Sequence, residues 1–313
     1  MKKFEETGSV ADVKTSSRAR LRRSDENIDA VRQSVAENPN TSIRHRAQEL
    51  SISATTLHRI LTKDLSLHAY KIQLTQELKP DDHLKRLTFA NWVHEQRQAN
   101  VDFSQKILFS DEAHFHLGGY VNKQNCRIWA DENPRKIVEK PLHPRKVTVW
   151  CGFHANGVIG PYFFEDDAGN PVTVTGERYR AMITNFLWHA LDGMDIGGLW
   201  FQQDGATSHT ANSTMTLLNE KFPGRIISRN SDVNWPPRLC DLTPLDFFLW
   251  GYLKSKIYAN SPTTIQQLKD AIAQQINEIS PQLCTEVIRN FDHRVNVCRR
   301  SLGEHLGDII FHT

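Results

Sequence analysis

The chain has 313 residues, of which 39% are hydrophobic and 24% are charged. This composition is typical of a globular protein, and the length allows one large domain or a large and a small one. No apolar run approaches the roughly 20 residues that a membrane-spanning helix needs, and the N-terminus lacks the apolar stretch of a signal peptide. We therefore expect an intracellular protein without a membrane partner.

The cysteines and the overall charge exclude some classes of protein. None of the five cysteines forms a Cys-x-x-Cys pair, so neither a disulfide framework nor a zinc site is indicated. The net charge of +2 is too small to imply a nucleic-acid partner by itself. From Lys14 to Arg23, however, KTSSRARLRR carries five basic residues and no acidic one. Such a run can neutralise phosphates or act as a nuclear address; a solvated arm is the alternative.

Residues 1–24 are polar and rich in serine and arginine, which is typical of an arm or linker. Three short helices are predicted over residues 25–64: one after Ser24, ended by the Asn-Pro-Asn at 38–40, then SIRHRAQELS, then ATTLHRILTKD. Short helices with a brief turn before the last one match a helix-turn-helix. A small helical bundle without a role in DNA binding would give the same pattern.

In a helix-turn-helix, the start of the last helix enters the major groove of DNA, and neighbouring basic residues contact the phosphate backbone. The candidates for DNA contact are polar or basic residues that we expect on the surface of this motif or in the basic arm. They are Ser53, Thr55, Thr56, His58 and Arg59 at the last helix, Arg44 and Arg46 in the helix before it, and Arg18, Arg20, Arg22 and Arg23 in the arm.

Residues 65–100 are expected to form a connector that ends in a helix starting at Pro80. Residues 101–313 then mix strands and helices. The predicted strands are KILFSDEAHFHL, CRIWA, KVTVWCGF, GVIGPYFFE, 199–202 and 225–228; the predicted helices are 175–191 and one capped by Ser208 or Thr210 that runs to Phe222. This order predicts a mixed α/β sheet flanked by helices, and it is also the element order of the ribonuclease-H-like fold.

Three aspartates stand at places where they could meet. Asp111 and Asp204 each stand where an apolar strand ends, and Asp246 follows Pro244, which favours a helix start. Carboxylates from three segments suit two Mg²⁺ ions about 3.5–4 Å apart, which neutralise the attacking and leaving oxygens of a phosphodiester. A strand-end or helix-cap carboxylate is the alternative for each, and spacing alone does not decide between them.

Other side chains compete for these roles. Asp241 competes with Asp246, because both bracket the same Leu-Thr-Pro turn. Glu112 competes with Asp111, although strand alternation points it to the opposite face of the sheet. His209 could contact a phosphate, or it could cap and pack its helix.

Three blocks of sequence together resemble the mariner-type cut-and-paste DNA transposases of the DDE/D superfamily. They are LFSDEAHFHLGGYVNKQNCRIWADENP, QQDGATSHTA and VNWPPRLCDLTPLDFFLWGYLK, and the resemblance extends from the helix-turn-helix to GEHLGDIIFHT. It implies an RNase-H-like catalytic domain over 101–313 with Mg²⁺ or Mn²⁺, two ions per active site. It also implies a nuclear homodimer that cuts both DNA strands at terminal inverted repeats and joins the freed 3′-hydroxyls to target DNA, usually at TA.

The family motifs assign the catalytic and metal-binding residues. The motif FSDE gives Asp111, QQDGA gives Asp204 and DLTPLD gives Asp246. The third acid of the family follows the proline of that last motif, which favours Asp246 over Asp241. The 41 residues between Asp204 and Asp246 exceed the number in typical mariner elements, which indicates a divergent branch.

Two features depart from the family pattern. The AT-hook-like linker GRPR of the family reads SRAR at 17–20, and KKFEETGSV resembles the tail of a first helix-turn-helix. The resemblance therefore implies an N-terminally truncated transposase with intact core chemistry and impaired recognition and pairing of DNA ends. The alternatives are a truncated or co-opted transposase that only binds DNA, and a general RNase-H-like nuclease.

Overall fold

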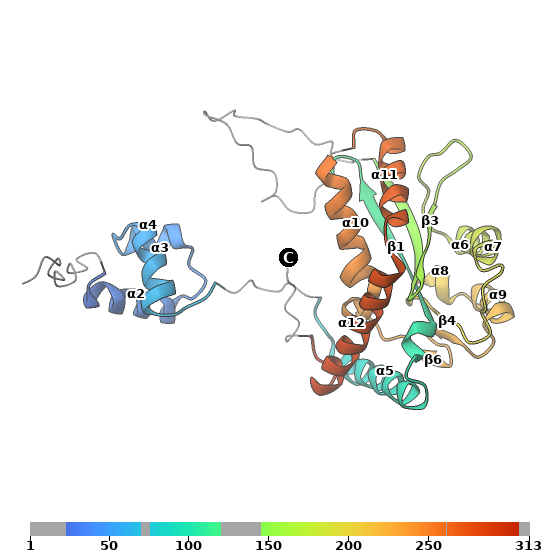
Figure 1. Ribbon diagram of the computed structural model, residues 1–313, viewed down its shortest axis with the longest axis horizontal. Coiled ribbons are helices and arrows are strands. Elements are labelled where there is room, and N and C mark those ends of the chain that lie inside the picture. Colours follow the sequence, from blue (N-terminus) through green and yellow to red (C-terminus); the bar gives the residue numbers. More distant parts are fainter. Residues whose placement is uncertain (1–22, 70–75, 120–144, 261, 307–313) are drawn as a thin grey trace, which may run out of the picture. The chain divides into compact units, whose positions relative to one another are not determined.

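The computed structural model describes residues 23–69, 76–119, 145–260 and 262–306 (Figure 1). The chain divides into two compact units, residues 1–74 and residues 75–313. None of the described helices is long and apolar enough to cross a membrane.

The first unit is a bundle of short helices. It contains α2 (Asp25–Glu37), α3 (Ile43–Glu49), α4 (Ala54–Arg59) and the π-helical turn η1 (Ile60–Asp64). Each of the three α-helices begins after a serine whose hydroxyl accepts a hydrogen bond from a backbone N–H of the first turn, which satisfies one free donor there. Val31, Ala47, Leu57 and Ile60 are buried between the helices. The three predicted helices are confirmed.

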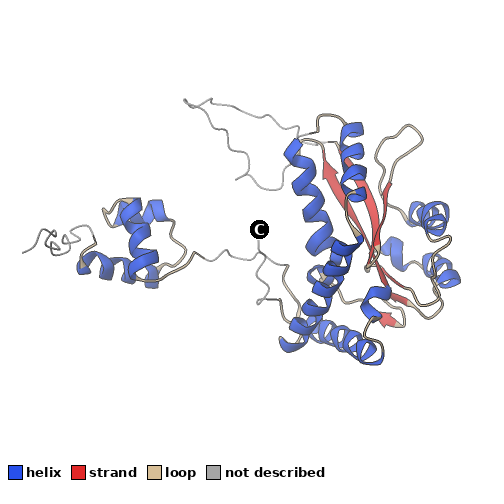
Figure 2. Ribbon diagram, viewed as in Figure 1, coloured by secondary structure: helices blue, strands red, loops and turns tan. Residues whose placement is uncertain are grey.

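A mixed six-stranded sheet forms the centre of the second unit (Figure 2). Its strands are β1 (Ile107–His116), β2 (Lys146–His154), β3 (Gly157–Phe163), β4 (Trp200–Gln202), β5 (Ile226–Ser228) and β6 (Val233–Asn234). In the order β3-β2-β1-β4-β5-β6, the first three strands are antiparallel, and the pairs from β1 to β6 are parallel. The predicted mixed sheet is confirmed; the expected strand CRIWA lies outside the described residues.

Helices cover both faces of this sheet (Figure 1). One apolar core packs against α5 (Pro80–Ala99), α10 (Trp250–Ile257), α11 (Ile265–Asn277) and α12 (Pro281–Arg300), with η2 (Phe103–Lys106) beside them. The other packs against α6 (Gly176–Met182), η4 (Ile183–Leu187), α7 (Trp188–Ala190), α8 (Thr207–Thr210) and α9 (Asn212–Lys221). Neighbouring residues of β1 enter different cores, Phe109 the first and Leu108 the second, because successive side chains of a strand point to opposite faces.

The segment after β4 differs from the prediction of one helix capped by Ser208 or Thr210. Two short helices form instead, and each follows an alanine, Ala206 or Ala211, that offers no capping side chain. The hydroxyl of Thr210 donates to the carbonyl of Ala206 and so remains inside the first helix. The predicted cap was therefore wrong, and the short helix α8 carries His209 into a buried position.

Candidate metal centre

The sheet leaves one strand edge open next to two of the aspartates. Parallel pairing between β1 and β4 covers only Ile107 to Phe109 of β1, and beyond that point no strand among the described residues pairs with β1 on this side. Asp111 lies on this unpaired stretch, and Asp204 follows β4 by two residues. Contrary to the sequence prediction, Asp111 lies in the middle of β1 and not at the end of a strand, because antiparallel pairing with β2 continues the strand to His116. Both carboxylates lie just beyond the stretch where β1 and β4 pair.

Asp111, Asp204 and Asp246 line a single cavity of about 1240 Å³. Asp246 comes from the π-helical turn η6 (Leu245–Leu249), whose start is set by Pro244. Trp250, in the first turn of α10, donates its indole N–H to Oδ2 of Asp111 at 2.8 Å. The structure thus brings together the three acids that the sequence motifs selected from three separate segments.

Asp241 has a different environment. Its two carboxylate oxygens accept hydrogen bonds of 2.8 and 2.5 Å from the guanidinium of Arg86, which is completely buried. Arg86 also donates to the carbonyls of Arg238 and Gly303. A carboxylate held in this bidentate pair neutralises a buried cation, so its charge is not available to a metal ion in the cavity.

Crowding of negative charge changes the acidity of the three acids. Burial, followed by the charges of Asp246 and Glu112, raises the pKa of Asp111 well above its usual range. Burial and the charge of Asp204 raise the pKa of Asp246 to about 6. For Asp204, burial raises the pKa, but the hydrogen bond and charge of His209 outweigh it and the pKa is lowered. This concentration of negative charge favours a bound cation.

His209 links the cavity to the opposite face of β1. Its Nδ1 lies 2.6 Å from Oδ1 of Asp204, and its Nε2 lies 3.3 Å from Oε1 of Glu112. The ring also packs on Tyr179, with 4.2 Å between the ring centroids. Burial lowers the pKa of His209, but the hydrogen bonds and charges of Asp204 and Glu112 raise it to about 10.

The sequence left two roles open for His209, a phosphate contact or a capping and packing residue; the structure shows the packing and adds a link between two carboxylates. The side chain is buried and bridges two carboxylates, so it neither caps a helix nor faces the cavity as a free phosphate contact. The alternation of side chains along β1 predicted that Glu112 lies on the face opposite Asp111. This was the sequence signal for its contact with His209. No signal located Tyr179, because 29 residues separate it from His209 in the chain.

The donor set fits a hard divalent cation. Mg²⁺ prefers carboxylate oxygens and keeps several water or phosphate ligands. Within the described ranges, no group of three or more acidic, histidine or cysteine side chains is placed so that it could hold a metal ion by itself. A site that is completed by water and by substrate phosphate needs fewer protein ligands. Burial and the neighbouring carboxylates raise the pKa values of Asp111 and Asp246, which a bound cation would counteract.

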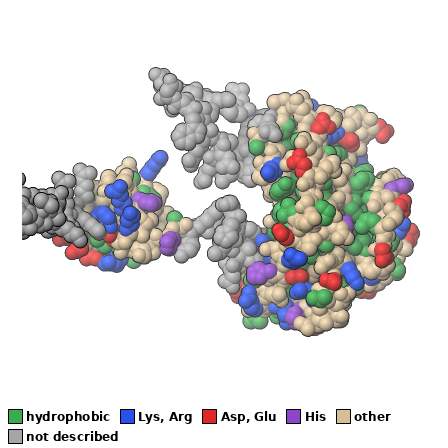
Figure 3. Space-filling view, in the orientation of Figure 1, with side chains coloured by type: hydrophobic (Ala, Val, Ile, Leu, Met, Phe, Trp, Pro, Cys, Tyr) green, Lys and Arg blue, Asp and Glu red, His purple; other side chains and the backbone are tan. Residues whose placement is uncertain are grey.

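In the helical unit, part of the predicted DNA-contacting set lies on the surface. Arg44 of α3 is exposed, as are Thr55, His58 and Arg59 of α4. Lysine, arginine and histidine side chains are visible on one face of this unit (Figure 3). These four residues are therefore accessible to a DNA backbone or groove. Ser53 caps α4.

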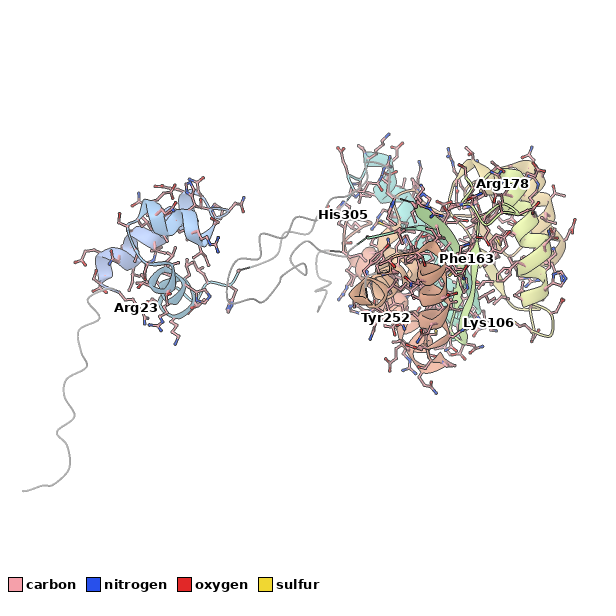
Figure 4. All side chains as sticks on the ribbon, turned by 90° about the horizontal axis from the view of Figure 1, so that it is seen from above. Arg23, Lys106, Phe163, Arg178, Tyr252 and His305 are labelled. Atoms are coloured by element: carbon pink, nitrogen blue, oxygen red, sulfur yellow. The ribbon has the colours of Figure 1, made fainter. Side chains whose placement is uncertain are left out.

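Three other predicted contacts are engaged inside the unit. Arg46 is 2% exposed and donates to Oγ of Ser34 and the carbonyl of Asn38, so its assignment to the DNA surface was wrong. Thr56 is buried, since α4 turns it toward the core. Arg23, labelled in Figure 4, forms an ion pair with Asp64 at the end of η1. Arg18, Arg20 and Arg22 lie outside the described residues.

Two proteins are similar to this chain in sequence. The transposable element Tc3 transposase of Caenorhabditis elegans is 27% identical over 266 residues, which cover 83% of this chain and 74% of that protein. The histone-lysine N-methyltransferase SETMAR of Homo sapiens is 24% identical over 278 residues, which cover 86% of this chain but only 38% of that protein. No protein-family model matches the chain.

Several solved structures are similar to this chain in fold. A pre-cleavage Mos1 transpososome matches 97% of this chain and 86% of its own with a TM-score of 0.71 at 15% identity. The Mos1 mariner paired-end complex with Mn gives a TM-score of 0.70 at 17% identity, with 97% and 86% covered. The catalytic domain of Mos1 transposase matches 74% of this chain and 99% of its own at a TM-score of 0.57 and 17% identity. The chain is thus similar in sequence to Tc3 transposase and to SETMAR, and its fold is that of the Mos1 transposase structures.

Proposed function

We propose that this chain is a cut-and-paste DNA transposase, which cleaves DNA at terminal inverted repeats and transfers the freed ends into target DNA, at TA. One observation carries this function: three carboxylates from β1, from the end of β4 and from η6 line one cavity of an RNase-H-like unit. The relatedness to Tc3 transposase supports it.

Asp111, Asp204 and Asp246 would hold Mg²⁺ or Mn²⁺, and we propose two ions. When bound, such ions neutralise charge on the attacking and leaving oxygens and lower the pKa of the attacking water or hydroxyl. Two side chains of the protein are hydrogen-bonded to these acids, Trp250 to Asp111 and His209 to Asp204. Metal dependence is supported by solved Mos1 transposase structures that contain Mg or Mn.

The same cavity offers charge for the DNA backbone. Lys79 and Lys85 at the start of α5, and Arg229 after β5, are exposed and line it together with the acids. Lysine and arginine neutralise phosphates, and they can therefore hold a strand so that one phosphate faces the carboxylates. These three residues are positioning groups for the substrate.

The helical unit would bind DNA, and the protein would act as a homodimer in the nucleus. Exposed Arg44, Thr55, His58 and Arg59 would contact double-stranded DNA at a transposon end. A homodimer that pairs two ends is supported by the likeness to Mos1 paired-end and strand-transfer complexes. Because its substrate would be chromosomal DNA, the protein would act in the nucleus.

A cleavage assay tests the function. Purified chain is incubated with end-labelled DNA that carries the repeats flanking its reading frame in the genome, with Mg²⁺ or with EDTA. We expect nicking at the repeat with Mg²⁺ only, and none by Asp204→Ala. Equal cleavage by the two proteins would refute the proposal. DNA binding that is indifferent to metal, without cleavage, would instead select the alternative of a protein that only binds DNA.

A further inference from the structure

One oxygen of Asp204 is already occupied. Oδ1 accepts hydrogen bonds from the backbone N–H of Ala206 at 2.9 Å and from Nδ1 of His209 at 2.6 Å. In the described part of the chain, no residue is hydrogen-bonded to Oδ2. The side chain is 52% exposed and belongs to no helix or strand, so packing alone does not fix its direction. These two hydrogen bonds are its main restraint.

His209 is itself held from several directions. Its Nε2 lies 3.3 Å from Oε1 of Glu112, and its ring packs on Tyr179. The hydroxyl of Tyr179 donates to Oε1 of Gln203 at 2.9 Å, and the amide of Gln203 donates to the carbonyl of His209 at 3.0 Å. The side chain of His209 is only 4% exposed. A ring fixed in this way presents Nδ1–H to Asp204 in one direction.

We propose that His209, held by Glu112, is the positioning residue that directs Oδ2 of Asp204 into the cavity as a one-oxygen metal ligand. The inference rests on the proposed function, because it takes Asp204 to be a metal ligand. A partner behind a ligand raises metal affinity by fixing the ligand's orientation, and its loss costs about 10- to 100-fold in affinity. His209 therefore acts through Asp204 and contacts neither the metal nor the DNA.

Direct titration of the full chain with Mn²⁺, in the absence of DNA, tests this role by calorimetry. We expect His209→Ala to bind Mn²⁺ about 10- to 100-fold more weakly than the wild type. His209→Asn keeps an N–H donor close to the position of Nδ1, and it should recover most of the loss. His189→Ala is the matched control, because His189 is exposed on the nearby helix α7, and it should bind Mn²⁺ like the wild type.

Glu112 provides a second pair of variants that leaves the histidine in place. Glu112→Gln retains an acceptor for Nε2 and should bind Mn²⁺ close to the wild-type affinity, whereas Glu112→Ala releases the ring and should bind it more weakly. Melting temperatures in EDTA identify any variant that does not fold. If His209→Ala fails to fold, the comparison between Glu112→Gln and Glu112→Ala decides.

The outcomes separate this inference from the proposed function. Mn²⁺ affinity that is unchanged in folded His209→Ala, or equally low in the Ala and Asn variants, would overturn the positioning role. A wild-type chain that binds no Mn²⁺ would overturn it as well. If the expected affinity pattern is found but DNA is not cleaved, the positioning role stands and the transposase function fails. If cleavage depends on Asp204 but not on His209, the transposase function stands and the positioning role fails.

Discussion

At the scale of single residues, Asp241 and Asp246 show how neighbouring carboxylates acquire different tasks. Both flank the same turn, and spacing alone could not separate them. In the structure, Asp241 neutralises the buried Arg86, whereas Asp246 faces the cavity that contains Asp111. The decisive partner of Asp241 stands 155 residues earlier in the chain. Only the family motif selected Asp246 in advance, because no local pattern reports a pairing over that distance.

The acidity of Asp246 leads to a prediction for the metal-free protein. Its pKa is raised to about 6 in the folded state, so the folded protein holds this proton more tightly than the unfolded chain does. This contribution to stability is present below about pH 4 and is lost as the pH rises through about 6. Urea unfolding in EDTA at several pH values measures it as the difference in unfolding free energy between wild type and Asp246→Asn.

That difference should fall from pH 4 to pH 7. Because Asp246 is exposed to the cavity, water screens its charge, and the fall should be smaller than about 1.36 kcal/mol for each unit of the pKa shift. Groups that do not interact with Asp246 cancel in the difference. A difference that stays constant or grows with pH would contradict the proposed crowding of charge.

Arg44 and Arg46 form a matched pair for a second prediction. Arg44 is exposed, whereas Arg46 is buried and donates to two groups of α2 and the turn after it. Arg44→Ala should weaken DNA binding with little effect on stability. Arg46→Ala should lower the unfolding free energy of the helical unit by about 1–3 kcal/mol, because it removes a buried side chain that makes two hydrogen bonds. DNA-binding titrations and thermal unfolding of both variants check this; equal effects of both would contradict it.

At the scale of helices and strands, apolar periodicity was sufficient for most of the fold. The strands β1 to β5 and the helices of the first unit follow from it, because buried faces repeat with a period of two or of about 3.6 residues. The break between α8 and α9 did not follow. Ala206 and Ala211 carry no capping side chain, so the sequence contains no local signal for the two helix starts that bury His209. The link between His209 and Asp204 therefore needed the structure.

Gly303 gives a prediction at the same scale. It follows α12 with φ +85°, and an added Cβ would lie 2.1 Å from the carbonyl oxygen of His83 at the start of α5. Gly193 has φ +83°, but a Cβ there would meet nothing within 4 Å. Gly193→Ala should therefore cost only the backbone strain, about 1–2 kcal/mol.

Gly303→Ala should cost more than Gly193→Ala, because α5 must also shift and the hydrogen bond from Arg86 to the carbonyl of residue 303 would be disturbed. Urea unfolding of the two variants gives the comparison directly. Equal losses of unfolding free energy would show that the contact between α12 and α5 is not tight at this point.

At the scale of the whole molecule, chemistry depends on bringing distant segments to one cavity. Composition and charge indicated a globular protein and no more. The motif order, together with the resemblance that it carries, predicted the mixed sheet and the three acids. It did not predict the supports behind them, the indole of Trp250 on Asp111 and the imidazole of His209 on Asp204, since such contacts arise only from packing.

We propose that Asp111, Asp204 and Asp246 act as one metal-dependent cleavage site and that Asp241 does not belong to it. The most direct measurement compares Mg²⁺-dependent cleavage of repeat-bearing DNA by four Asp→Asn variants, at a temperature where circular dichroism shows all of them folded. We expect no cleavage by the variants at 111, 204 and 246, and retained cleavage by Asp241→Asn. Retained cleavage by Asp246→Asn, with loss of cleavage in folded Asp241→Asn, would contradict it.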